Sequence, residues 1–339
     1  MRSRRGTAAG LAPVALAGAL ALGGCGSGAP GNPLQRRLVA GATGTGAGPH
    51  LVALQRIADE NGGNRASPGP GYEASVQYVA AVLRAAGYDV STPAYPLPKR
   101  HRRSSGTCCQ NVIAQTRTGD PARVVMAGAH LDSVRKGPGI NDNGSGVAAL
   151  LEIATRLGGA PPVRNAVRFA FWGSEEDGLK GSTHYVKALS RSQRGDILLY
   201  LNLDMIASPN AGYFVLGGEG KTAAKCGPRG SAQVACALAG QLAATGVVAR
   251  TAPFDRESDY AAFIDAGIPS GGVWSGDRKN KSGKQARRWG GQAGEPFDPH
   301  YHTRRDRLDD LNRTALDRFT RAVAGTVAHF AVPIDSRPG

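Results

Sequence analysis

The sequence predicts an α/β fold, a three-layer sandwich in which helices cover both faces of a central mixed, mostly parallel β-sheet. Two observations lead to this prediction. Segments with helical spacing of apolar residues alternate with short, nearly unbroken apolar runs, such as residues 124–126 and 167–171, which are typical of strands buried on both faces. Polar residues then follow several of these runs, at the strand ends where open α/β sheets build their sites.

The expected elements follow one another without an internal repeat. Helical spacing starts at residues 50–61, where Leu51, Leu54 and Ile57 recur, and continues in a second helix at residues 72–87. Further helices are expected at residues 145–157, 178–189, 232–245, 259–266 and 315–331. Strands are expected at residues 88–95, 111–115, 123–127, 166–171, 197–203, 213–216 and 271–274. Because 41% of the residues are hydrophobic, we expect a single well-packed domain, residues 49–335.

The first 24 residues have the pattern of a targeting segment. Met1–Arg5 contains three arginines, an apolar run covers residues 8–22, and Cys25 follows the sequence Leu-Gly-Gly. The run is too short to span a bilayer as a mature helix. Residues 1–24 therefore resemble a bacterial lipoprotein signal peptide, with Cys25 as the lipidated residue. An ordinary secretory peptide cut near Ala29, or an unused cysteine, is the alternative.

The composition that follows indicates an exported chain. Residues 25–48 are rich in Gly, Ala, Pro, Ser and Thr, and we expect a flexible tether between lipid and domain. The protein is expected at the outer face of the cytoplasmic membrane, or secreted, and as a monomer. The formal net charge of +15 favours anionic surfaces. Dispersed basic residues and an aromatic content of 6% argue against nucleic-acid binding.

Four cysteines remain after Cys25, and export permits disulfides between them. Cys226 and Cys236 flank a loop of Gly, Pro and Ser residues, and we expect them to form a disulfide. Cys108 and Cys109 are adjacent, so on a strand they point to opposite faces, and their pairing stays open.

The candidate site consists of histidines and carboxylates at expected strand ends and in polar turns. Alone, each residue has an ordinary interpretation as a surface pair, a helix cap or a turn residue. Glu175 and Glu176 are harder to explain in this way, because two adjacent acids at a buried strand end repel each other unless a cation lies between them. Histidine and carboxylates without a nearby cysteine are typical of a hydrolytic zinc site. The candidates are His130, Asp132, Asp142, Glu175, Glu176, Asp204 and His302.

The order of short motifs adds a resemblance to a known family. The chain contains, in this order, HLDS, NDNGSG, EEDGLKGS, LNLDM, SDY and YHT. In this it resembles the di-zinc aminopeptidases of the M28 type, and among them the single-domain secreted enzymes of Streptomyces. The resemblance extends from about Leu51 to Phe330. It implies a zinc exopeptidase fold, two Zn²⁺ ions and peptide substrates.

The resemblance assigns metal ligands residue by residue. It implies that Asp142 bridges both zinc ions, that His130 and Asp204 complete one site, and that Glu176 and His302 complete the other.

Roles outside the metal ligands also follow from the resemblance. Glu175 is expected to be the general base, Tyr301 to donate a hydrogen bond to the oxyanion, and Asp132 to orient His130. In such enzymes the peptide bond of Asp142–Asn143 is often cis.

One departure from the family pattern concerns the loop that carries the last ligand. Members often have a cysteine just before the Tyr-His pair and another three residues after the His, but here these positions hold His300 and Arg305. We expect Asp298 or Asp306 to fix the loop instead, by pairing with Arg305.

A second departure concerns recognition of the substrate amine. The Streptomyces enzymes have Arg directly before the Ser-Asp pair, whereas this chain has Glu257 there and Arg256 one position earlier. Which of the two contacts the substrate stays open.

From these features we predict an exported zinc aminopeptidase that removes N-terminal, preferably apolar, residues from peptides. A carboxypeptidase or deacylase built on the same metal core is one alternative. A solute- or peptide-binding lipoprotein is another, but it would need neither Glu175 beside Glu176 nor Tyr301 beside His302.

Overall fold

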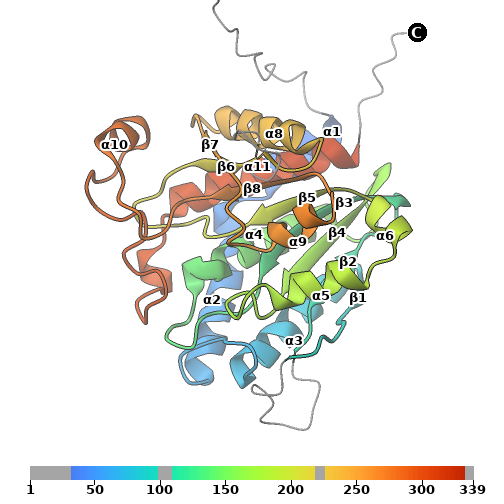
Figure 1. Cartoon of the computed structure of the whole chain (residues 1–339), viewed down its shortest axis with the longest axis horizontal. Helices are drawn as coiled ribbons and strands as arrows, with labels where there is room; N and C mark the ends of the chain where they lie inside the picture. The colour runs from blue at the N-terminus through green and yellow to red at the C-terminus, as the bar shows by residue number, and fades with distance from the viewer. Residues whose placement is uncertain (1–31, 98–108, 218–225, 333–339) are drawn as a thin grey trace, which may run out of the picture.

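The structure is a computed structural model that describes residues 32–97, 109–217 and 226–332. Within these ranges an eight-stranded sheet forms the centre, with helices on both faces (Figure 1). The strands are β1 (Asp89–Ser91), β2 (Val112–Gln115), β3 (Asp120–His130), β4 (Asn165–Trp172), β5 (Ile197–Leu203), β6 (Phe214–Leu216), β7 (Arg250–Ala252) and β8 (Ser270–Trp274). The predicted α/β fold is confirmed.

The sheet is mixed, with a parallel centre. Its strand order is β1-β2-β4-β3-β5-β8-β6-β7. Strands β4, β3, β5 and β8 run parallel to one another, whereas the pairs β1–β2, β2–β4 and β6–β8 are antiparallel. Parallel strands end at a common edge, so His130 at the end of β3 lies beside the segments that follow β4 and β5.

The helices form the two outer layers of the sandwich. Because successive strand residues point to opposite faces, Val125 and Ala127 of β3 pack in one core, while Val124 and Met126 pack in the other. The first core includes α1–α4, α8 and α11, and the second includes α5 and α9. The helices are α1 (Pro33–Gly41), α2 (Gly44–Glu60), α3 (Pro70–Ala85), α4 (Gly146–Leu157), α5 (Lys180–Ala188), α6 (Arg191–Gly195), α8 (Ser231–Ala244), α9 (Tyr260–Asp265), α10 (Gly283–Trp289) and α11 (Arg313–Ala331).

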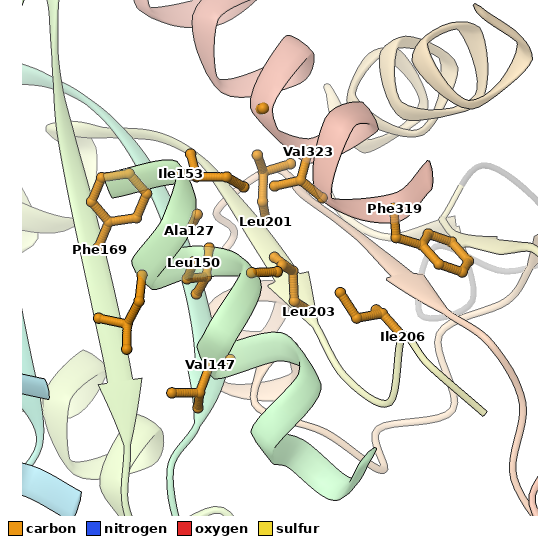
Figure 2. Packing of buried hydrophobic residues seen from close by; sticks show 14 of the residues in the cluster. Ala127, Val147, Leu150, Ile153, Phe169, Leu201, Leu203, Ile206, Phe319 and Val323 are labelled. Atoms are coloured by element: carbon orange, nitrogen blue, oxygen red, sulfur yellow. The ribbon is translucent and has the colours of Figure 1, made fainter. Parts of the chain in front are cut away.

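Helix α4 anchors the segment just before it, which carries Asp142. Val147, Leu150 and Ile153 of α4 belong to the same buried cluster as Leu201 of β5 (Figure 2). Full burial of such an aliphatic side chain contributes roughly 1.5–3 kcal/mol. The start of α4 is therefore held firmly against the sheet.

The predicted tether is wrong from residue 33 onward. Leu34 and Leu38 of α1 are buried in the core that also contains α11, and α2 begins at Gly44, earlier than predicted. Gly46 lies so close to α4 that a Cβ there would be 2.0 Å from Glu152 Oε1. The glycines that suggested a flexible linker instead permit close packing of helices.

Short elements account for other differences from the prediction. Helices α6 and α10 and strand β7 are too short to show a period in the sequence. The expected strand at residues 88–95 contracts to β1, because Pro93 follows it and proline cannot donate to a ladder. By contrast, β5 occupies the predicted residues 197–203.

Only some of the cysteines lie among the described residues. Cys25, Cys108 and the predicted signal peptide lie outside the described residues. Cys236 in α8 is disulfide-bonded, but the structure does not describe Cys226 as its partner. The Cys226–Cys236 pairing is therefore not confirmed and stays a prediction. Among the described residues, no helix combines the length and the apolar character needed to cross a bilayer.

Candidate metal centre

The candidate ligands come together at the carboxyl edge of the parallel strands. His130 ends β3, Glu176 lies in the loop after β4, and Asp204 directly follows β5. Asp142 lies in the turn before α4, and His302 in the loop between β8 and α11. These five residues, predicted from scattered motifs, form one cluster.

Asp142 lies between two histidine–carboxylate pairs. His130 Nε2 is 3.2 Å from Asp142 Oδ1 and 3.4 Å from Asp204 Oδ1. His302 Nε2 is 3.0 Å from Asp142 Oδ2 and 3.0 Å from Glu176 Oε2. Each oxygen of Asp142 thus faces a different histidine, the arrangement needed for a carboxylate that bridges two cations. The peptide bond Asp142–Asn143 is cis, as the family resemblance implied.

The cluster has the chemistry of a metal site. Ligand atoms of His130, Asp142 and Glu176 all lie within 4.8 Å of one another. Glu176 Oε1 and Asp204 Oδ1 are buried, and among the described residues neither has a hydrogen-bond partner. Burying an unpaired carboxylate oxygen is costly, and a bound cation would remove that cost. Nitrogen and oxygen donors of this kind suit Zn²⁺.

The pKa values of Glu175 and Glu176 also reflect the crowding of charge in this cluster. Burial, and then the charge of Asp142, raises the pKa of Glu176 to about 7. Burial also raises the pKa of Glu175 well above its usual range, aided by Asp259 and Asp204 and opposed by His130. So many carboxyl groups cannot all ionise together without cations among them.

Asp132 contacts both His130 and the Glu175 backbone. The nearer atom to His130 Nδ1 is the backbone carbonyl oxygen of Asp132, at 3.1 Å, while its carboxylate Oδ1 is 3.8 Å away. Oδ1 accepts a hydrogen bond of 3.1 Å from the Glu175 backbone N–H. A carbonyl acceptor fixes the ring orientation and leaves Nε2 to face the metal position, so the structure adds the Asp132 backbone to the predicted orienting group.

Two buried aspartates tie the His302 loop to the Asp142 segment. Asp306 accepts backbone N–H bonds from Asn141 and Asp142, at 2.6 and 3.0 Å. Asp298 accepts from Asn141 Nδ2 at 2.6 Å and from the His300 N–H at 2.7 Å. The expectation that one of these acids fixes the loop agrees with the structure. The expected partner was wrong: the acids bind the Asn141–Asp142 segment, because a buried carboxylate needs the nearest N–H donors, rather than Arg305.

Arg65 and Ser258 were missed by the sequence reasoning. Arg65 is fully buried and donates from Nε to Pro138 O at 3.0 Å, from Nη2 to Gly139 O at 2.7 Å, and from Nη1 to Leu131 O. It thus holds the loop between His130 and Asp142, and burial lowers its pKa to about 10. Ser258 Oγ donates to Asp204 Oδ2 at 2.6 Å. The sequence predicts site residues from polar side chains at strand ends, and neither Arg65 nor Ser258 belongs to that pattern.

The predicted catalytic residues lie at the same edge. Glu175 is half-buried next to Glu176. Tyr301 is half-buried, and its ring stacks on that of His302 with 3.8 Å between centroids. Burial, followed by the charge of Asp142, raises the pKa of Tyr301 above its usual value. Its hydroxyl therefore stays protonated and can act as a hydrogen-bond donor.

A small pocket opens beside Asp204 and Tyr301. Its volume is about 80 Å³, and its lining includes Glu257. Arg256 does not line it and pairs instead with Asp265. Of the two residues left open by the sequence, Glu257 is therefore the one placed near the metal centre.

Comparison with known proteins identifies the family. The profile of peptidase family M28 matches residues 111–327, well over half of the chain. The chain belongs to this family. The matched segment contains all five candidate metal ligands, whereas Arg65 lies outside it.

Curated relatives of the M28 chain include bacterial aminopeptidases. It is 49% identical over 259 residues to the probable lipoprotein aminopeptidase LpqL of Mycobacterium tuberculosis, covering 75% of this chain and 52% of the relative. It is 43% identical over 278 residues to leupeptin-inactivating enzyme 1 of Streptomyces exfoliatus, covering 81% and 59%. The chain thus spans about half the length of the curated relatives it matches.

Solved structures share the fold. A zinc aminopeptidase from Bacillus subtilis superposes with a TM-score of 0.68 at 16% identity, covering 87% of this chain and 97% of that one. The LapA aminopeptidase of Legionella pneumophila gives a TM-score of 0.68 at 16% identity, covering 98% and 81%. These two structures thus share the α/β fold of this chain.

Proposed function

We propose that this M28 chain is an exported, zinc-dependent aminopeptidase that releases N-terminal residues from peptides. The observation that carries the proposal is Asp142, whose two carboxylate oxygens face one histidine each. That geometry supports two Zn²⁺ ions, with His130 and Asp204 on one side and Glu176 and His302 on the other. Relatives described as aminopeptidases support this substrate class over the carboxypeptidase, deacylase and binding-protein alternatives.

When bound, two zinc ions supply Lewis-acid activation of water and of the scissile carbonyl. Glu175 would take the proton from the attacking water and return it to the leaving amine, the role of a positioned carboxylate base. Tyr301 donates its O–H to the oxyanion that forms on the carbonyl. Asp132, Asp298 and Asp306 hold the loops from which these groups project.

The zinc part of the proposal is tested by metal removal. Purified protein should hold close to two zinc ions per chain and hydrolyse leucine 4-nitroanilide. A chelator should abolish the activity, and added Zn²⁺ should restore it. N-acetyl-leucine 4-nitroanilide is the matched control, because an aminopeptidase needs the unblocked amine. Hydrolysis by zinc-free protein, or equal hydrolysis of the acetylated substrate, would contradict the proposal.

The location and the apolar preference also belong to this proposal. The sequence pattern around Cys25 and the relative described as a lipoprotein support a lipid anchor, and no second subunit is needed to complete the site. Apolar pocket walls formed by Met205, Leu216 and Trp274 support apolar N-terminal residues. Cys25→Ser should release the protein from membranes or block its processing. Wild-type protein with an unmodified, soluble N-terminus would contradict the anchor.

A further inference from the structure

The pocket beside the metal centre has the size and place of a side-chain site. Asp204 and Tyr301 line it on the side of the metal centre, and Leu216 and Trp274 contribute apolar wall. Its volume is about 80 Å³. The pocket therefore fits one side chain of a bound peptide rather than a whole ligand.

The outer lining of this apolar pocket is acidic. Asp255, Glu257 and Asp277 all line it, in a chain that carries 41 Lys and Arg against 26 Asp and Glu. Asp255 is engaged locally, since it accepts from the Tyr260 hydroxyl and from the Glu257 backbone N–H. Asp277 faces Lys279 Nζ at 3.7 Å. For the exposed Glu257 carboxylate, the described residues provide neither an ion pair nor a hydrogen bond.

The basic side chains that the structure describes near the pocket do not pair with Glu257. Arg256 turns away and pairs with Asp265. Arg278 lies over the Tyr301 ring, 5.3 Å from its centroid, and Lys279 lies 5.5 Å from the Trp274 ring centroid, beside Asp277. Among residues 32–97, 109–217 and 226–332, therefore, no basic side chain pairs with the Glu257 carboxylate, which lies next to an aromatic wall.

We propose that Glu257 widens the substrate range of this pocket from apolar N-terminal side chains to long side chains with a positive end. This inference rests on the proposed aminopeptidase function. The methylene stem of a lysine or arginine would pack along Leu216 and Trp274, as such stems do on apolar surfaces. Its charged end would reach Glu257 and Asp277. Apolar residues of similar length still fit, and acidic residues are rejected by like charge.

The test compares two substrates that differ only in the terminal ammonium group of the side chain. Lysine and norleucine 4-nitroanilides have the same stem, so the ratio of their kcat/KM values measures recognition of the ammonium group. Glu257→Gln should lower this ratio by roughly three- to tenfold, between the values of exposed and partly desolvated ion pairs. Glu257→Lys should lower this ratio further and should raise activity on a third substrate, glutamate 4-nitroanilide. Glu73→Gln, an exposed acid in α3, is the control and should keep the wild-type ratio.

Each outcome decides between defined alternatives. An unchanged ratio in Glu257→Gln, with zinc content at the wild-type level, would overturn the inference. Equal losses on both substrates would also overturn it, and would place Glu257 at the α-amine that all substrates share. Higher salt should lower the lysine-to-norleucine ratio of the wild type, because salt screens an exposed ion pair. If wild type hydrolyses neither substrate with zinc present, the aminopeptidase proposal itself fails, which is a separate result.

Discussion

The two sides of the pocket beside Asp204 are built in opposite ways. On the metal side, Asp298 and Asp306 are 1% and 3% exposed and Arg65 is fully buried, and each makes at least two hydrogen bonds to loop atoms. On the rim of the pocket, Glu257 is exposed. Buried networks thus hold the candidate metal ligands in place, whereas the residue proposed to choose the substrate is exposed and can change without disturbing the fold.

The largest effect is expected from the general base on the metal side. Glu175→Ala should lower kcat by about 10²–10⁴-fold, the usual contribution of a positioned proton acceptor, with zinc content unchanged. Glu176→Ala should instead lose zinc, because it removes a ligand. Rate and zinc content measured on the same samples separate the two roles. Zinc loss in Glu175→Ala, with zinc and rate kept in Glu176→Ala, would show that the roles are reversed.

Arg65 tests how far the buried network supports stability. Arg65→Met removes a buried charge that faces Asp132 and Asp306, and such losses cost about 3–5 kcal/mol. Urea denaturation should show a fall of that size in the unfolding free energy. The exposed Arg56→Met in α2 is the control, with an expected change of less than about 0.5 kcal/mol. Equal effects would remove the contrast between the two regions.

A smaller loss, of zinc affinity, is expected when the hydrogen bonds from Asp306 to the Asn141–Asp142 backbone are weakened by a side chain of the same shape. Asp306→Asn leaves one of the two N–H groups of Asn141 and Asp142 without a full acceptor. Groups that support ligands typically contribute 10–100-fold to metal affinity or activity, so the zinc dissociation constant should rise by about that factor. The exposed Asp309→Asn should leave the constant unchanged. If Asp306→Asn keeps the wild-type zinc dissociation constant, the hydrogen bonds of Asp306 are not needed for zinc binding.

The metal side should also bind zinc more tightly as the pH rises. Hydrogen bonds to Asp142 and Glu176 raise the pKa of His302 to about 10 against the effect of burial, and the pKa of Glu176 is raised to about 7. Without metal these groups keep protons at neutral pH, and zinc must displace them. Affinity should therefore rise about tenfold per pH unit for each proton displaced, as chelator competition at pH 6, 7 and 8 would measure. A zinc affinity that stays the same from pH 6 to pH 8 would contradict this prediction.

The smallest effect is expected on the rim. Glu257→Gln should change the unfolding free energy by less than about 0.5 kcal/mol, as is usual for exposed positions. Thermal unfolding of Glu257→Gln and Arg65→Met, measured side by side, compares the two regions directly. A loss of several kcal/mol would show that the rim is structural after all.

Site residues at strand ends could be predicted from the sequence, whereas the contacts that support them could not. His130, Asp204 and Glu176 could be predicted, because buried strands show as apolar runs and parallel strands end at one edge. Arg65 could not, because its contacts are to backbone carbonyls more than 60 residues away in the chain. Helix α1 could not, because glycine composition alone does not separate a linker from a close helix contact, as Gly46 shows.

Helix α1 also limits how far the enzyme could move on a lipid anchor. If Cys25 carries the lipid, the first described residue, Asn32, follows only seven residues later. A fully extended chain of that length spans about 25 Å, whereas a leash ending at residue 48 would span about 80 Å. The catalytic body would then sit against the lipid surface instead of sampling a wide volume above it. Peptides would have to arrive at that surface to be trimmed, and the anchor would set where in the cell envelope cleavage takes place.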